Sequence, residues 1–175
     1  AQRDPDSIES RLLLASALLA RGDAAEAART LEQAERASPD RIDVLCALGE
    51  ACTRLERWDE AERRLARAAA VDPHSPVVPH ARALLELARR RWEPAAEAAL
   101  DALDRRHRYP EAHYTLGVAL AWLGDAAHAI QSFRVALSMR PGMVDAHLFL
   151  ARLLAKQGDA AKGAEHAATA RTLLA

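Results

Sequence analysis

Several residue types are rare or missing in this chain, and their scarcity narrows the fold class. The 175 residues include no asparagine, and only 4% of them are aromatic. Valine and isoleucine are also scarce, which argues against a β-rich fold because strands favour β-branched and aromatic side chains. Alanine supplies much of the 50% apolar content. This composition indicates closely packed helices.

The chain also lacks an excess of charge of one sign and any long apolar run. The formal net charge is −1 at pH 7, so no strongly basic field exists to attract a nucleic acid or an anionic membrane. No apolar run is long enough to span a bilayer. We therefore expect neither a nucleic-acid partner nor a membrane span.

Cysteine is nearly absent as well. Cys46 and Cys52 are six residues apart on one predicted helix, where their side chains point to different sides and should not bond to each other. A disulfide scaffold is excluded, and we expect two free, mostly buried thiols. This favours a reducing compartment such as the cytoplasm.

One pattern of 34 residues recurs five times along the chain without insertion or deletion. Its clearest copy begins at Pro110 and has two helical stretches separated by Gly124-Asp125. When positions are numbered from Pro110, positions eight, twenty and twenty-seven are alanine or glycine in every copy. These fifteen residues are Ala15, Gly49, Ala83, Gly117, Ala151, Ala27, Ala61, Ala95, Ala129, Gly163, Ala34, Ala68, Ala102, Ala136 and Ala170.

The small residues have a physical cause. Two antiparallel helices joined by a short loop cross closely, and larger side chains at the crossing would move the axes from about 8 Å toward 10 Å. The sequence therefore predicts closest approach at these positions, with larger residues such as Leu14, Leu18 and Leu31 filling the flanks.

A Gly-Asp pair separates the two helices in three of the repeats, at Gly22-Asp23, Gly124-Asp125 and Gly158-Asp159. Glycine accepts the left-handed conformation that ends a helix. Aspartate caps the next helix by accepting from its free N–H groups. The pair therefore predicts a tight helix-turn-helix. In the first repeat, its two helices are expected near Ile8–Arg21 and Ala24–Ala37.

These features resemble the tetratricopeptide repeat, which has the same period and a signature matched here by Leu116-Gly117, Ala129, Phe133 and Pro141. The resemblance implies an all-α fold, a right-handed α-α superhelix (solenoid) of five 34-residue helix-turn-helix units with about ten helices. It implies a single array over residues 1–175, in which residues 1–7 are the remnant of a preceding repeat or a linker. The five repeats are residues 8–41, 42–75, 76–109, 110–143 and 144–175.

Repeat three departs furthest from the pattern. Arg82 stands where leucine is expected, and Pro76 and Pro79 lie near the start of its first helix. Proline is tolerated only in the first turn, so this helix should begin later than its equivalents. The repeat is either a diverged copy that folds normally or a softer joint in the array.

No motif in the sequence predicts catalysis. There is no Gly-x-Ser-x-Gly, no glycine-rich phosphate loop and no His-Glu-x-x-His. His113 and His147 are equivalent residues of successive repeats, and we expect both to serve in packing. We predict no catalytic residue, no cofactor and no metal site, and therefore no enzymatic activity.

The family resemblance also implies a concave groove lined by the first helix of each repeat. Some relatives grip a terminal carboxylate with lysine and asparagine, but those residues are missing here, which argues against that mode of binding. The groove is expected to bind a peptide or partner protein, although its residues could instead pack between helices. The predicted peptide-binding residues are His80, Leu84, Glu111, Tyr114, Val118, Trp122 and Arg152.

These observations predict a scaffold for protein–protein interaction. The alternative is a targeting or regulatory segment of a larger enzyme, such as a transferase or hydrolase, encoded on the same chain. A third hypothesis is homo-oligomerisation through uncapped ends, because repeat arrays need terminal helices with a polar outer face.

Overall fold

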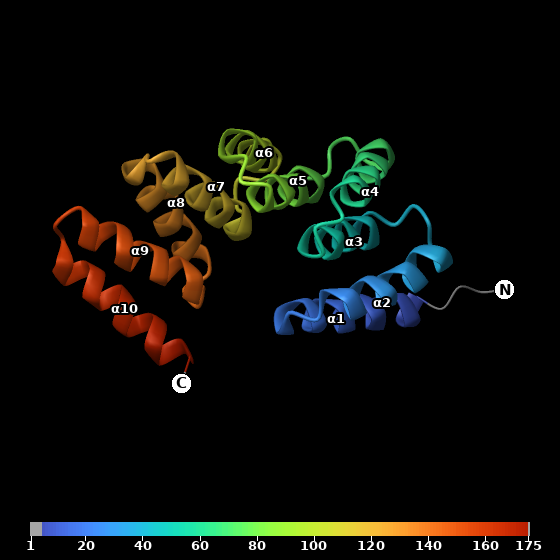
Figure 1. Ribbon diagram of the computed structural model, residues 1–175, viewed down its shortest axis with the longest axis horizontal. Coiled ribbons are helices and arrows are strands. Elements are labelled where there is room, and N and C mark those ends of the chain that lie inside the picture. Colours follow the sequence, from blue (N-terminus) through green and yellow to red (C-terminus); the bar gives the residue numbers. More distant parts are fainter. Residues whose placement is uncertain (1–4, 175) are drawn as a thin grey trace. The chain divides into compact units, whose positions relative to one another are not determined.

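The computed structural model describes residues 5–174, with side chains from Ile8 onward, and all regular secondary structure in this range is helical (Figure 1). The all-α class predicted from the sequence is confirmed. The helices are α1 (Pro5–Arg21), α2 (Ala24–Ala37), α3 (Ile42–Arg54), α4 (Trp58–Val71), α5 (Val77–Ala88), α6 (Trp92–Arg105), α7 (Pro110–Leu123), α8 (Ala126–Met139), α9 (Val144–Lys156) and α10 (Ala160–Leu174).

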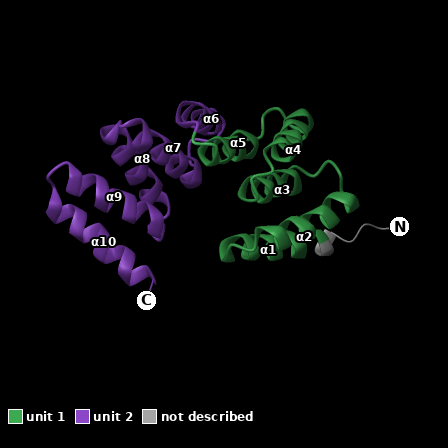
Figure 2. Cartoon of the chain, viewed as in Figure 1, with its two compact units in different colours: residues 1–90 green, residues 91–175 purple. Residues whose placement is uncertain are grey.

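The chain forms two compact units, Ala1–Arg90 and Arg91–Ala175 (Figure 2). The boundary separates α5 from α6, the two helices of repeat three. The first unit therefore holds the hairpins α1–α2 and α3–α4 together with α5. The second holds α6 followed by the hairpins α7–α8 and α9–α10.

In the first unit the first helices of successive repeats touch one another, since α3 contacts both α1 and α5 as well as α2 and α4. Its core is built from leucine and alanine, including Leu31, Leu48 and Leu65, each at most 2% exposed. Cys46 and Cys52 are buried in the same core as free thiols, as the sequence predicted. Burial, with a smaller effect of Asp43, raises the pKa of Cys46 to about 12.

In the second unit α7 packs against α6 and α8, and α9 packs against α8 and α10. Its main described core cluster surrounds Phe133, which is fully buried between α7 and α9. The Phe133 ring lies 5.2 Å from that of Phe149 and 5.7 Å from that of Tyr114, measured between centroids. Three aromatic rings therefore join successive repeats here.

The alanines and glycines of the repeat mark the close approaches between helices, as predicted. All fifteen are buried except Ala151, which is half-buried. A Cβ atom added at Gly117 would lie 2.8 Å from the Phe133 ring, and one added at Gly163 would lie 2.9 Å from the Ala151 carbonyl oxygen. Residues larger than these would force the helices apart.

The turns between paired helices share a left-handed residue at position fifteen. Gly22, Gly124 and Gly158 have φ angles of 90°, 88° and 90°. In repeats two and three the same conformation is held by Glu56 and Arg90, with φ angles of 58° and 59°. The turn geometry is thus kept where glycine is absent, at the cost of a strained backbone.

The aspartates that follow the turn glycines do not all cap a helix. Asp125 accepts from the N–H of His128 at 3.2 Å, and Asp159 accepts from that of Lys162 at 3.3 Å. The prediction of a cap at Asp23 was wrong, because its side chain makes no cap hydrogen bond and instead pairs with Arg21 at 3.3 Å.

Three predicted features of single helices can be compared with the structure. Helix α5 begins at Val77, one position later than α3, α7 and α9, as the prolines predicted. Helix α1 begins at Pro5 rather than near Ile8, because proline fits the first turn of a helix; residues 1–4 lie outside the described part. Leu14 does not fill a flank but is 52% exposed, since no described helix precedes α1.

Candidate functional site

A hollow of about 410 Å³ opens between α1 and α3 in the first compact unit. All of its lining residues occupy positions five, six, nine, twelve or thirteen of their repeats, which places them on the first helices. Four of the seven are apolar and three are polar. The lining residues are Leu12, Ser16, Leu19, Ala20, Ala47, Glu50 and Arg54.

Arg54 links the two helices that line this hollow. Its Nη1 donates to the carbonyl oxygen of Leu19 at 2.9 Å, which ties α3 to α1. Its Nη2 donates to Glu50 Oε1 at 2.8 Å, one turn earlier on α3. The two charges therefore largely neutralise each other, and the hollow presents apolar surface beside hydrogen-bonding groups.

Small side chains create this hollow, and sequence reasoning found only part of it. The family resemblance implies that Leu12, Ser16, Glu50 and Arg54 face the groove, and the hollow also includes Leu19, Ala20 and Ala47. The signal available in the sequence was the run of small residues at groove positions in repeats one and two. Cys46 also occupies a groove position of the family, position five, but it is 4% exposed and belongs to the core.

The predicted residues of repeat three in the first unit are His80 and Leu84. Both lie on α5 and both are half-buried. Because α5 packs beside α3, these side chains continue the row of first helices that begins at the hollow. The remaining five predicted residues lie in the second compact unit.

Tyr114, Val118 and Trp122 form a single stripe along α7, since they are spaced by four residues. Trp122 is 61% exposed, whereas Val118 and Tyr114 are half-buried. The Trp122 ring is stacked on that of Trp92, with centroids 5.2 Å apart and planes at 11°. Trp92 thus packs between adjacent helices and supports Trp122 from one side.

Tyr114 lies partly within the core. Its ring contacts that of Phe149 on α9 edge-on, with centroids 6.1 Å apart, in addition to Phe133. Burial, with a smaller effect of nearby Asp145, raises the pKa of the Tyr114 hydroxyl to about 12. Tyr114 is therefore neutral at physiological pH and serves in packing as well as on the surface.

The two charged residues of the predicted set differ in their surroundings. Glu111 pairs with Arg140, which follows the end of α8. Arg152 is exposed on α9 and, within residues 8–174, has neither an ion pair nor a side-chain hydrogen bond. Its charge is therefore available at the surface.

The equivalent histidines of repeats four and five have the same role. The Nε2 of His113 lies 3.1 Å from the carbonyl oxygen of His107, and that of His147 lies 2.9 Å from the carbonyl oxygen of Pro141. Each histidine thus anchors the loop six residues before it. His147 also contacts His166, Nδ1 to Nδ1, at 2.9 Å. No group of three potential metal ligands gathers anywhere between residues 5 and 174.

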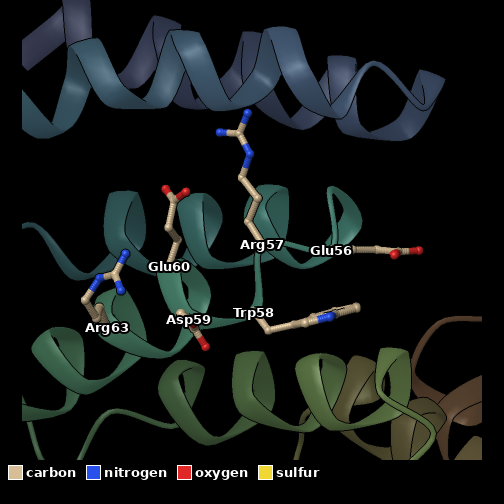
Figure 3. A pocket seen from close by; sticks show the side chains of 6 residues that line it. All are labelled: Glu56, Arg57, Trp58, Asp59, Glu60 and Arg63. Carbon is tan, nitrogen blue, oxygen red and sulfur yellow. The ribbon is translucent and has the colours of Figure 1, made fainter.

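Two further hollows lie off the first-helix face. One of about 270 Å³ opens between α4 and α5. The other, of about 310 Å³, surrounds the start of α4, where Figure 3 shows Arg57 and Glu60 extending to the same side. This second hollow is formed by one short polar stretch. Its lining residues are Glu56, Arg57, Trp58, Asp59, Glu60 and Arg63.

The sequence has two basic stretches, residues 89–91 and 105–108, and an arginine of each makes a contact within the fold. Arg89 lies over the Trp58 ring at 5.5 Å and also pairs with Glu62. Arg106 lies over the Tyr109 ring at 5.2 Å. These arginines stabilise neighbouring helices.

No helix described in the structure combines the length and apolar character that crossing a membrane requires.

Two models of the tetratricopeptide repeat match the sequence, one over residues 1–44 and 18–86 and the other over residues 80–144 and 123–173. The chain belongs to the tetratricopeptide repeat family. The resemblance seen in the sequence is thereby confirmed. Tetratricopeptide arrays serve in general as scaffolds for protein–protein interaction and are typically non-catalytic.

Solved structures of tetratricopeptide proteins share the fold. TTC0263, a thermophilic protein from Thermus thermophilus, matches with a TM-score of 0.82 and 22% identity over 93% of this chain and 89% of its own. PilF from Pseudomonas aeruginosa gives a TM-score of 0.78 and 20% identity over 98% of this chain and 78% of its own. MamA from Desulfovibrio magneticus RS-1 gives a TM-score of 0.67 and 19% identity over 96% of this chain and 95% of its own. Among curated proteins, none matches the sequence.

Proposed function

We propose that this tetratricopeptide array is a non-enzymatic scaffold that binds segments of partner proteins along the faces of its first helices. The observation that carries this proposal is the hollow between α1 and α3. Its seven lining residues all come from first helices, and they combine four apolar side chains with the Arg54–Glu50 ion pair. Such a mixture is typical of sites that bind side chains of a peptide.

Each compact unit carries a binding face of its own. The first unit contributes the hollow together with His80 and Leu84 on α5. The second contributes Glu111, Tyr114, Val118 and Trp122 on α7, together with Arg152 on α9. Tryptophan and tyrosine are common anchors of protein interfaces because they bury a large area with little loss of side-chain entropy.

Two variants test this proposal without disturbing the core. Ser16→Arg fills the hollow from an exposed position, and Trp122→Ala removes the exposed aromatic ring. Ala25→Arg and Leu100→Ala are the matched controls, because both residues are exposed on second helices. Circular dichroism checks that all four variants keep the helicity of the wild type.

Peptide ligands are first selected from a random displayed library against the wild-type chain, and their dissociation constants are then measured for each variant by calorimetry. We expect Ser16→Arg or Trp122→Ala to weaken binding by roughly tenfold or more, with both controls unchanged. Equal affinity for all four variants and the wild type, or a loss confined to the controls, would show that the first-helix face is not the binding site.

A further inference from the structure

An apolar stripe and two unpaired cations lie on the same side of the second compact unit. The stripe is formed by Tyr114, Val118 and Trp122 on α7. Arg152 and Lys156 are four residues apart on α9 and therefore share one face of that helix. Both cations are exposed, and within the described residues neither has an ion pair or a side-chain hydrogen bond.

Contacts between α7 and α9 place the stripe and the cations on neighbouring helices. The rings of Tyr114 and Phe149 meet at 6.1 Å, and Val118 and Leu153 pack against the same core cluster. Arg152 follows Phe149 by three residues, so it lies on the face of α9 that borders α7. Lys156 extends this face by one further turn toward the end of the helix.

Acidic side chains on this face do not neutralise the two cations. Glu111 is already paired with Arg140. Asp145 is exposed at the opposite end of α9, seven residues before Arg152, which corresponds to two turns or roughly 10 Å. Two other cations of the unit are paired, Lys162 with Asp159 and Arg105 with Asp101.

We propose that the face formed by α7 and α9 binds an acidic segment of a partner protein that also carries an aliphatic or aromatic residue. The apolar residue would pack against Trp122 and Val118, and the carboxylates would pair with Arg152 and Lys156. The proposal rests on the proposed function and adds the chemical class of the ligand. Complementary charge at the rim of an interface mainly sets specificity and association rate.

A protein segment suits this face better than a single-stranded nucleic acid. Stacking of successive bases needs several aromatic side chains along a positively charged groove. Here Trp122 is the one large aromatic residue exposed within residues 8–174, and the chain has a net charge of −1. An acidic peptide requires only one apolar contact and the two cations.

Parallel selections from a random peptide library test the ligand class. The wild-type chain, the double variant Arg152→Glu/Lys156→Glu and a control, Arg134→Glu/Arg171→Glu, are used under identical low-salt conditions. The control removes the same charge from exposed positions on second helices. We expect acidic residues to be enriched beside an aliphatic or aromatic residue on the wild type and the control. The Arg152→Glu/Lys156→Glu variant should instead select peptides with basic residues.

The outcomes separate this proposal from the broader one. In one outcome, all three proteins select peptides of the same charge composition, but Trp122→Ala abolishes their binding. This result would overturn the acidic ligand class and leave the first-helix site intact. Peptides unaffected by Trp122→Ala and Ser16→Arg would overturn both. A twelve-nucleotide oligo-dT that binds the wild type more tightly than any selected peptide would also overturn the acidic-peptide proposal.

Discussion

Replacing Gly117 with alanine should destabilise the second compact unit, although alanine is the better helix former. A Cβ atom at this position would lie 2.8 to 3.0 Å from three atoms of the Phe133 ring, which would have to retreat by about 0.6 Å to reach ordinary contact at 3.4 Å. The ring has little room to do so. It is fully buried and packed against both Phe149 and Tyr114.

The magnitude follows from two opposing effects. Alanine is favoured over glycine inside a helix by about 0.8–1.0 kcal/mol. Overpacking a filled core typically costs about 1–3 kcal/mol, and the contact at Gly117 belongs to the upper part of that range because the obstructing ring is enclosed. We therefore expect a net loss of about 1–2 kcal/mol in the free energy of unfolding.

Urea unfolding followed by circular dichroism measures this change. Gly142→Ala is the matched control, because no heavy atom lies within 4 Å of its added Cβ, and it should be neutral or stabilising by up to about 1 kcal/mol. Gly117→Ala is also measured in a Phe133→Leu background, where the smaller side chain should relieve the clash. A Gly117→Ala variant more stable than wild type, or an equal loss in both backgrounds, would refute the reasoning.

Three further predictions concern the turns, the thiols and a helix cap. Glu56→Gly and Arg90→Gly should each raise the free energy of unfolding by up to about 1 kcal/mol, since both residues hold the left-handed conformation. A loss of stability in both variants would contradict this. Cys46 and Cys52 should resist Ellman's reagent at pH 8 until the chain unfolds, because both are buried and burial raises the pKa of each thiol. Hydrogen bonds to the Asp125 carboxylate lower its pKa, so its stabilising effect is present above the ordinary value near 4 and is lost as the pH falls through the lowered pKa. Asp125→Asn should therefore be less stable than wild type at pH 7 but not at pH 2, as measured by urea unfolding.

The period of the repeat determined most of the fold in advance. Alanine or glycine at three fixed positions identified the helix crossings, and the Gly-Asp pairs identified the turns. Local signals were less reliable where one side chain had two possible partners. Asp23 carries the same sequence signal as Asp125, yet it pairs with Arg21 instead of capping its helix.

Position within the array also limited what the pattern could predict. Leu14 is equivalent to Leu48, Leu116 and Leu150, which are all buried. No described helix precedes α1, so the same residue type at the same position is exposed there. A repeat pattern describes an average environment and does not show which neighbours a particular helix has.

The candidate site could be predicted only as a set of positions. The sequence placed the binding face on the first helices, but the hollow depends on how side-chain volumes combine across two helices. Ser16, Ala20 and Ala47 leave space between α1 and α3, whereas Tyr114 and Phe149 fill the equivalent region between α7 and α9. The availability of Arg152 likewise depends on where acidic side chains lie in three dimensions.

The location of the binding face is tested most directly by nuclear magnetic resonance, from the backbone amide signals that shift when a selected peptide is added. The account predicts that the perturbed amides belong to the first helices, α1 and α3 in one compact unit or α7 and α9 in the other. Perturbations confined to the second helices α2, α4, α6, α8 and α10 would contradict it.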